Sequence, residues 1–389
     1  MMKRSFLPVG QGAFYVETFF DTNNEYGRKI NIVYDCGAAS DLYFVEERIK
    51  EQFLENEIID AVFISHFDDD HINGLPFLLK YCHVKNMFFP FITTEEIILH
   101  QLSSLISKGE NSVVYGFLRN PYSYLEQLGL EEIPRLFQVY PSEEENKGSS
   151  NDFIGFDARK INSGSNVTSQ IFDTINDKNK PLNNWEFVPF IFRCSSKEKQ
   201  FELALKSELH INSIPHGESL VELYKNHKDA VKKAFAAVPG SNNTNSMVLF
   251  SGARDKNYKQ GICSLCWHRI QYPKGCRCDF NFMRCKKPCG CLYTGDYDAS
   301  GAQKWNNLKS AYDLYWNYIG CIQIPHHGSK HNYNSEFSKM NAYTIISAGS
   351  SNKYRHPHSS VVKNLIVNRS ELYLVTESLQ SRVDFLCNY

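Results

Sequence analysis

Two histidines and three aspartates occur together in one short segment of the sequence, residues 65–74. In order, they are His66, Asp68, Asp69, Asp70 and His71. Carboxylates packed this closely raise one another's pKa values unless a cation compensates their charge. Imidazole and carboxylate groups together suit Zn, Mn or Fe as ligands. The segment therefore predicts a metal site; the alternative is a solvated acidic loop with two surface histidines.

The spacing of these residues and the elements around them support the metal site. His66 and Asp68 can point the same way from an extended loop, while Asp70 and His71, after a turn, can face a second ion. Residues 61–65 predict a short buried strand, and residues 75–82 predict a helix. In an α/β sheet, the loop after the carboxyl end of a strand is where ligands collect.

The rest of the chain alternates in the same way. Apolar and β-branched runs predict strands, and charged amphipathic runs predict helices. The expected strands lie at 5–20, 30–36, 247–251, 291–294, 321–325 and 343–347, and the expected helices at 41–55, 75–82 and 217–236. This alternation predicts an α/β layered domain.

Further short motifs accompany the acidic segment along almost the whole chain. They are Val9-Gly10-Gln11-Gly12, Asp35-Cys36-Gly37, the Asn-rich strand 243–249, Leu292-Tyr293-Thr294-Gly295-Asp296, Pro325-His326-His327-Gly328-Ser329 and His356-Pro357-His358. With His66-x-Asp68-x-Asp70-His71, the set resembles the metallo-β-lactamase superfamily, in the form typical of the ComEC competence protein. The resemblance implies an αββα sandwich with two divalent metal ions, Zn or Mn, in its active site.

The resemblance also implies roles for individual residues. The implied metal ligands are His66, Asp68, Asp70, His71, Asp296, His327 and His356, with Asp296 bridging the two ions. Asp70 is expected to orient or deprotonate the attacking water and His326 to contact phosphate, although the sequence leaves open which of His326 and His327 is the ligand. Expected substrate contacts are Asn243, Asn245, Ser329, Lys330 and His358.

One departure from the family pattern concerns the choice of metal. Many members carry another histidine before the bridging aspartate, where this chain has Ser-Asn-Asn-Thr-Asn-Ser, residues 241–246. Asp68 also stands where a second histidine is common. One of the two sites is therefore expected to be rich in oxygen ligands, which makes Mn as plausible as Zn.

A cysteine-rich stretch predicts a second kind of metal site. Its candidate ligands are Cys263, Cys266, His268, Cys276, Cys278, Cys285, Cys289 and Cys291. So few apolar residues cannot form a core, and thiolate–zinc bonds would supply the folding energy. We expect a zinc-binding knuckle over residues 254–291 with one or two structural zinc ions; disulfides or buried free thiols are the alternative. Nine Lys or Arg against two Asp between Arg254 and Lys287, with aromatics interleaved, also suit nucleic-acid contact or a docking surface.

Composition limits the organisation of the chain. With 389 residues and a net charge of −1, no global field attracts a polyanion. We expect one half of the fold in residues 1–82, a partly helical insertion at 83–240 that could engage a protein partner, and the other half in 241–389. No run of about 18 apolar residues and no secretory signal is evident, so we expect no membrane contact and a cytoplasmic location.

The function expected from these features is a dinuclear metal-dependent hydrolase that uses a metal-activated water. The substrate expected is a phosphodiester, in single-stranded nucleic acid or a nucleotide, and a role in antiviral defence is a guess by analogy. Two alternatives remain. One is hydrolysis of a non-phosphate ester, lactone or thioester on the same metals, and the other is a metal-stabilised binding or sensor module.

Overall fold

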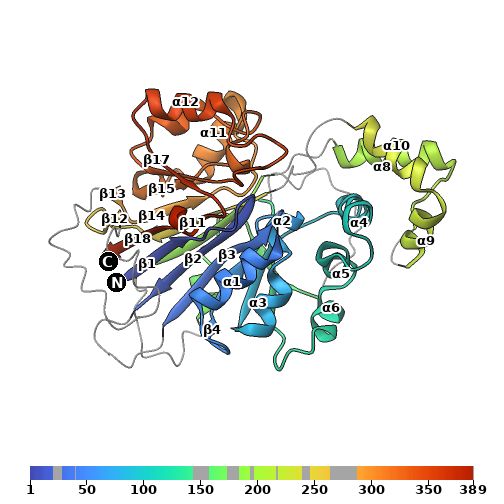
Figure 1. The fold of residues 1–389 in the computed structure, drawn as a ribbon, viewed down its shortest axis with the longest axis horizontal. Helices are drawn as coiled ribbons and strands as arrows, with labels where there is room; N and C mark the ends of the chain where they lie inside the picture. Colours follow the sequence, from blue (N-terminus) through green and yellow to red (C-terminus); the bar gives the residue numbers. More distant parts are fainter. Residues whose placement is uncertain are drawn as a thin grey trace.

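The computed structural model describes residues 1–20, 29–39, 41–142, 157–172, 184–192, 197–215, 218–238, 246–262 and 287–388. Two sheets form the centre of the molecule (Figure 1). The ten-stranded sheet has the order β13 (Lys287–Pro288), β12 (Lys259–Ile262), β18 (Val383–Asn388), β1 (Met2–Phe6), β2 (Gly12–Phe19), β3 (Ile30–Ala38), β5 (Ala61–Phe63), β7 (Asn86–Pro90), β8 (Arg135–Tyr140) and β9 (Arg159–Asn162).

The second sheet has six strands. Its order is β10 (Trp185–Ile191), β11 (Met247–Ala253), β14 (Gly290–Tyr293), β15 (Ile319–Gln323), β16 (Tyr343–Ser347) and β17 (Glu371–Val375). Strands β14 to β17 are parallel to one another. A separate pair joins β4 (Ile58–Ile59) to β6 (His83–Val84).

Helices cover the outer faces of the two sheets, which gives four layers (Figure 1). The ten-stranded sheet packs against α1 (Leu42–Gln52), α3 (Leu75–Tyr81) and α5 (Val113–Arg119), and the six-stranded sheet against α11 (Gly301–Ala311) and α12 (Ser359–Val367). The other helices are α2 (Asp69–Ile72), α4 (Thr94–Lys108), α6 (Pro121–Gln127), α7 (Thr168–Ile171), α8 (Lys197–Leu209), α9 (Glu218–Asn226) and α10 (Lys228–Ala237). Short 3-10 turns occur at Trp316–Tyr318, His326–Gly328, Ser335–Lys339 and Leu379–Ser381. The expected α/β class is confirmed.

Strand β2 shows why the sequences of the central strands are apolar almost throughout. Side chains alternate between the two faces of a strand. Tyr15 and Phe19 point into the core between the sheets, while Phe14 and Val16 point toward the helices on the other face. Both faces are therefore buried, and polar residues are excluded from most of the strand.

Part of the segment 83–240, which we expected to be an insertion, belongs to the two sheets. Strands β7, β8 and β9 extend the ten-stranded sheet in parallel, and β10 pairs antiparallel with β11. Residues 86–90, 135–140, 159–162 and 185–191 of this segment are therefore sheet strands. The partly helical character is seen in α4, α5 and α8 to α10, which share a hydrophobic cluster of their own.

The expected zinc knuckle lies mostly outside the described residues. Its flanking strands β12 and β13 pair with each other, and β12 also pairs with β18. Cys289 and Cys291 are buried in the core between the sheets, and Cys291 lies opposite Cys321 on the neighbouring strand. These two thiols pack as core residues, so their predicted role as zinc ligands gains no support.

No helix in the described ranges is long and apolar enough to cross a bilayer.

A buried ion pair in the ten-stranded sheet contacts the six-stranded sheet through Tyr293. The Nε atom of Arg4 donates to Glu17 Oε1 at 2.8 Å, and Nη1 donates to Gln260 Oε1 at 2.5 Å. The Tyr293 hydroxyl donates to Glu17 Oε1 at 2.9 Å. Because Arg4 is fully buried, its charge is compensated by these partners and not by water.

We predict that Arg4→Met lowers the free energy of unfolding by about 3–5 kcal/mol, because Glu17 is then buried without its cation. The matched control is Lys3→Met. Lys3 is partly exposed and lies 3.5 Å from Asp384, which keeps Arg382 as a partner, so the expected loss is less than about 1 kcal/mol. Urea unfolding of both variants provides the measurement. If both variants lose the same free energy of unfolding, the buried ion pair contributes no more to stability than the partly exposed one.

Candidate metal centre

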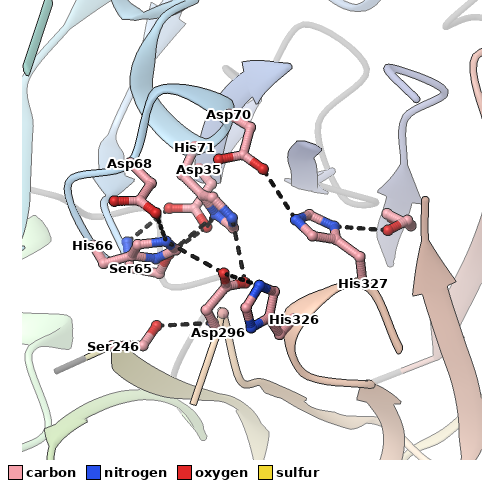
Figure 2. A network of polar contacts seen from close by, with 12 residues as sticks. Asp35, Ser65, His66, Asp68, Asp70, His71, Ser246, Asp296, His326 and His327 are labelled. Carbon is pink, nitrogen blue, oxygen red and sulfur yellow. Dashed lines mark hydrogen bonds and ion pairs between the residues drawn. The ribbon is translucent and has the colours of Figure 1, made fainter. Parts of the chain in front are cut away.

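Loops from both sheets meet at one edge of the sandwich (Figure 2). Residues 65–71 follow strand β5, Asp296 follows β14, and His326 and His327 follow β15. Strand β5 is parallel to β3, and β14 is parallel to β15, so the loops after their carboxyl ends share one edge. Residues that lie up to 261 positions apart, from His66 to His327, are brought together there.

His66 and His71 are oriented by a hydrogen-bonded pair behind them. The Nδ1 atom of His71 donates to Asp35 Oδ2 at 2.8 Å. Ser65 donates to the same carboxylate through its backbone N at 2.7 Å and its hydroxyl at 2.6 Å. Because that hydroxyl donates to Asp35, it accepts from His66 Nδ1 at 2.9 Å. In both rings Nδ1 is engaged, so Nε2 is the nitrogen that faces the site and can ligate a metal once it carries no proton.

His326 and His327 are held in the same way. His327 Nδ1 donates to the Ser347 carbonyl at 2.8 Å, and its Nε2 lies 3.2 Å from Asp70 Oδ2. His326 Nδ1 donates to Asn332 Oδ1 at 3.0 Å. All four imidazoles therefore have an acceptor behind Nδ1 and present Nε2 to the site, which is the usual orientation of metal-binding histidines.

The ligand atoms form two overlapping clusters that share His71. One contains His66, His71 and Asp296, and the other contains Asp70, His71 and His327; within each, the ligand atoms lie within 4.8 Å of one another. His66 Nε2 and His71 Nε2 are buried and have no hydrogen-bond partner among the described residues. Buried ring nitrogens without a partner fit a cation, which would displace any proton that they hold.

Asp296 lies between three of the imidazoles. Its Oδ2 is 3.6 Å from His66 Nε2 and 3.5 Å from His326 Nε2, and its Oδ1 is 3.4 Å from His71 Nε2. These separations are long for hydrogen bonds and suit atoms that ligate a common ion. The Ser246 hydroxyl accepts from the Asp296 backbone N at 3.0 Å, and Asn332 donates to its carbonyl at 3.0 Å.

The electrostatics of the site call for added positive charge. Burial, together with repulsion from Asp70 and Asp296, raises the pKa of Asp68 to about 8. Burial by itself would lower the pKa of His71, but the carboxylates of Asp296 and Asp35 raise it well above its usual value. In the metal-free protein, protons on Asp68 and His71 therefore reduce the negative charge that a bound divalent cation would otherwise neutralise.

Two motif glycines make room for this arrangement. A Cβ on Gly37 would meet the Asp70 carbonyl carbon at 2.7 Å. Gly295 has a φ of 52°, and a Cβ there would lie 2.3 Å from Ser246 Oγ, the group that fixes the Asp296 backbone. Only glycine fits both positions without moving the metal loops.

Two predicted ligands lie outside both clusters of the described residues. Asp68 is 31% exposed, and its Oδ2 lies 3.9 Å from His66 Nε2. The His356 ring lies farther out, with its centroid 5.6 Å from that of His326. His327 shares a cluster with Asp70, whereas His326 faces Asp296, so the geometry favours His327 as the ligand of the second ion.

The residues predicted to contact substrate differ in their exposure and in their hydrogen bonds. Ser329 is buried, and its hydroxyl accepts from the His331 backbone N at 3.3 Å. Lys330 is exposed beside it. His358 caps helix α12, accepting from the Ser360 backbone N at 3.2 Å. Asn243 and Asn245 lie outside the described residues, as do Cys263, Cys266, His268, Cys276, Cys278 and Cys285.

Sequence reasoning overlooked several residues that hold the site together. Asp35 belonged to a noted motif but received no role, and Ser65 and Asn332 have types too common to single out. His100, on helix α4, lies with Nδ1 at 3.7 Å from Asp68 Oδ1. Nothing near His100 in the sequence indicates this contact.

We predict that metal affinity rises with pH up to about pH 8. Asp68 and His71 both hold protons in the metal-free protein because their pKa values are raised. A cation displaces these protons, so binding strengthens as pH rises through this range and releases protons to the buffer. Titration calorimetry in two buffers of different ionisation enthalpy measures the number released. Asp68→Asn should release fewer protons at pH 7, and an affinity independent of pH would contradict the prediction.

Comparison with known proteins gives matches over part of the chain. Residues 25–87 match the family described as the metallo-beta-lactamase superfamily. A ribonuclease J of Mycoplasma pneumoniae (strain ATCC 29342 / M129 / Subtype 1) is 34% identical over 102 residues, which is 25% of this chain and 18% of that protein. The chain thus covers less than a fifth of the relative's length. The segment that matches the metallo-beta-lactamase superfamily contains His66, Asp68, Asp70 and His71.

Proposed function

We propose that the protein is a hydrolase that uses two divalent metal ions to cleave phosphodiesters, with single-stranded nucleic acid as the substrate class. The observation that carries this proposal is the shared orientation of four imidazoles. Each has Nδ1 engaged behind it and Nε2 directed at Asp70 or Asp296. In His66 and His71 that Nε2 is buried without a hydrogen-bond partner among the described residues, whereas a purely structural polar network would satisfy it.

The residues divide between two ions. His66 and Asp296 Oδ2 would hold the first, with Asp68 and His326 beside them, and Asp70, His71 and His327 would hold the second. Bound there, the ions would lower the pKa of a coordinated water and neutralise charge on the phosphate oxygens. Imidazole and carboxylate ligands suit Zn and Mn alike.

The chain's own side chains supply orientation and proton control. Burial would raise the pKa of Asp70, but the hydrogen bond to His327 and the charge of His71 lower it to about 2. Asp70 therefore stays ionised and serves to ligate or orient, so its predicted role as the group that deprotonates water is the less favoured one. His326 is partly exposed, so a phosphate oxygen can reach its Nε2, which donates a hydrogen bond there when the ring is protonated.

Two observations favour a nucleic acid over other esters. The matching stretch of ribonuclease J is the first. The second is the surface beside His326 and His356, where Lys330 and Lys353 are exposed and Tyr354 is 56% exposed with its ring parallel to that of His356. Cationic groups next to an exposed aromatic ring suit a phosphate backbone with unpaired bases.

We predict that Asp296→Ala lowers the turnover of bis(p-nitrophenyl) phosphate and of single-stranded oligonucleotides by on the order of 10²-fold or more, because a charge-stabilising group is lost. The matched control is Asp298→Asn. Asp298 follows two residues later, accepts from Ser300 at 2.9 Å and lies outside both clusters, so its variant should keep activity within about twofold of the unmodified protein.

The assay uses protein stripped with a chelator and reloaded with Zn or Mn, with circular dichroism as the folding check. p-Nitrophenyl acetate and a lactone test the alternative of non-phosphate ester hydrolysis. Absence of phosphodiester cleavage with either metal, or full activity in Asp296→Ala, would reject the proposal.

A further inference from the structure

Helix α4 places a buried histidine against the metal loop. The side chain of His100 is only 12% exposed, and its Nδ1 lies 3.7 Å from Asp68 Oδ1. The other oxygen of that carboxylate, Oδ2, lies 3.9 Å from His66 Nε2. Asp68 therefore stands between an imidazole of the metal site and an imidazole from a helix outside it.

Among the described residues, Asp68 has no side-chain hydrogen bond of the kind that holds Asp35 and Asp70. Asp35 accepts two hydrogen bonds from Ser65, and Asp70 is hydrogen-bonded to His327. Asp68 occupies the position before helix α2, but its side chain makes no capping hydrogen bond there. His100 is thus the group placed to restrain the outer oxygen of this carboxylate.

The helix that carries His100 is fixed at its start and along its buried face. The Thr93 hydroxyl accepts from the Glu96 backbone N at 3.3 Å, and the Glu96 carboxylate accepts from the Thr93 backbone N at 2.5 Å. Leu99 and Leu102 pack into the cluster that joins α4 to α8, α9 and α10. A donor on such a helix restrains its partner better than one on a free loop.

We propose that His100 is a positioning residue that acts through Asp68 on the first metal ion. The inference rests on the function proposed above. A carboxylate that ligates a metal is usually held by a hydrogen bond on its second oxygen, and His100 Nδ1–H would donate that bond once the ion draws Asp68 into place. A helix remote in sequence from the motif loops would in this way complete the oxygen-rich site.

The first test measures metal binding directly. Mn and Zn affinities are determined by competition with a fluorescent chelator, and the number of bound ions by elemental analysis. We expect His100→Ala to weaken one of the two ions by about 10–100-fold and leave the other unchanged. His100→Asn keeps an N–H donor near the Nδ1 position and should stay within about threefold of the unmodified protein.

Leu99→Ala is the matched control on the same helix. Leu99 is buried and makes no contact with Asp68 that the structure describes, so this variant should lower the melting temperature and leave both metal affinities unchanged. If Leu99→Ala weakens metal binding as much as His100→Ala does, helix stability is the cause and the proposal is overturned.

The second test is a double-mutant cycle on the same affinities. If His100 acts only through Asp68, then His100→Ala should have no further effect in an Asp68→Ala background. Equal losses in both backgrounds would overturn the proposal, as would unchanged affinities in both His100 variants. Unmodified protein that binds no metal would instead reject the proposed function, so the two failures are distinguishable.

Discussion

The structure depends on compensation of negative charge at one edge of the sandwich. Asp35 and Asp296 are buried in a small volume, and Asp68 and Asp70 lie partly buried beside them. Carboxylates in such a place repel one another and are poorly solvated. Protonated imidazoles offset part of this cost, and a pair of divalent cations would offset it more completely.

The four-layer architecture explains how the charges can be brought together. The two sheets bury a common apolar core, so each strand has to leave it before a polar residue can appear. Parallel strands send these polar residues to the same edge. The core also reaches the site directly. The Tyr15 hydroxyl donates to Ser347 Oγ at 3.0 Å, and the Ser347 carbonyl accepts from His327. The position of a proposed ligand is thereby linked to packing between the sheets.

Features that are local in sequence could be predicted, and those that arise from long-range packing could not. The strand at 61–65 and the ligand loop after it appear as β5 and the cluster residues, because a short apolar run ending in His and Asp is visible in the sequence itself. Strands β8 and β9 were not predicted, because each pairs in parallel with a strand that is distant in the sequence. His100 was missed for the same reason, because only the packing of α4 brings it to Asp68.

Anomalous diffraction from crystals grown with Zn or Mn tests the central claim most directly. The account predicts two peaks about 3.5–4 Å apart, one on either side of the Asp296 carboxylate, with His66 at the first and Asp70, His71 and His327 at the second. Crystals saturated with either metal that show no peak at these side chains would contradict it.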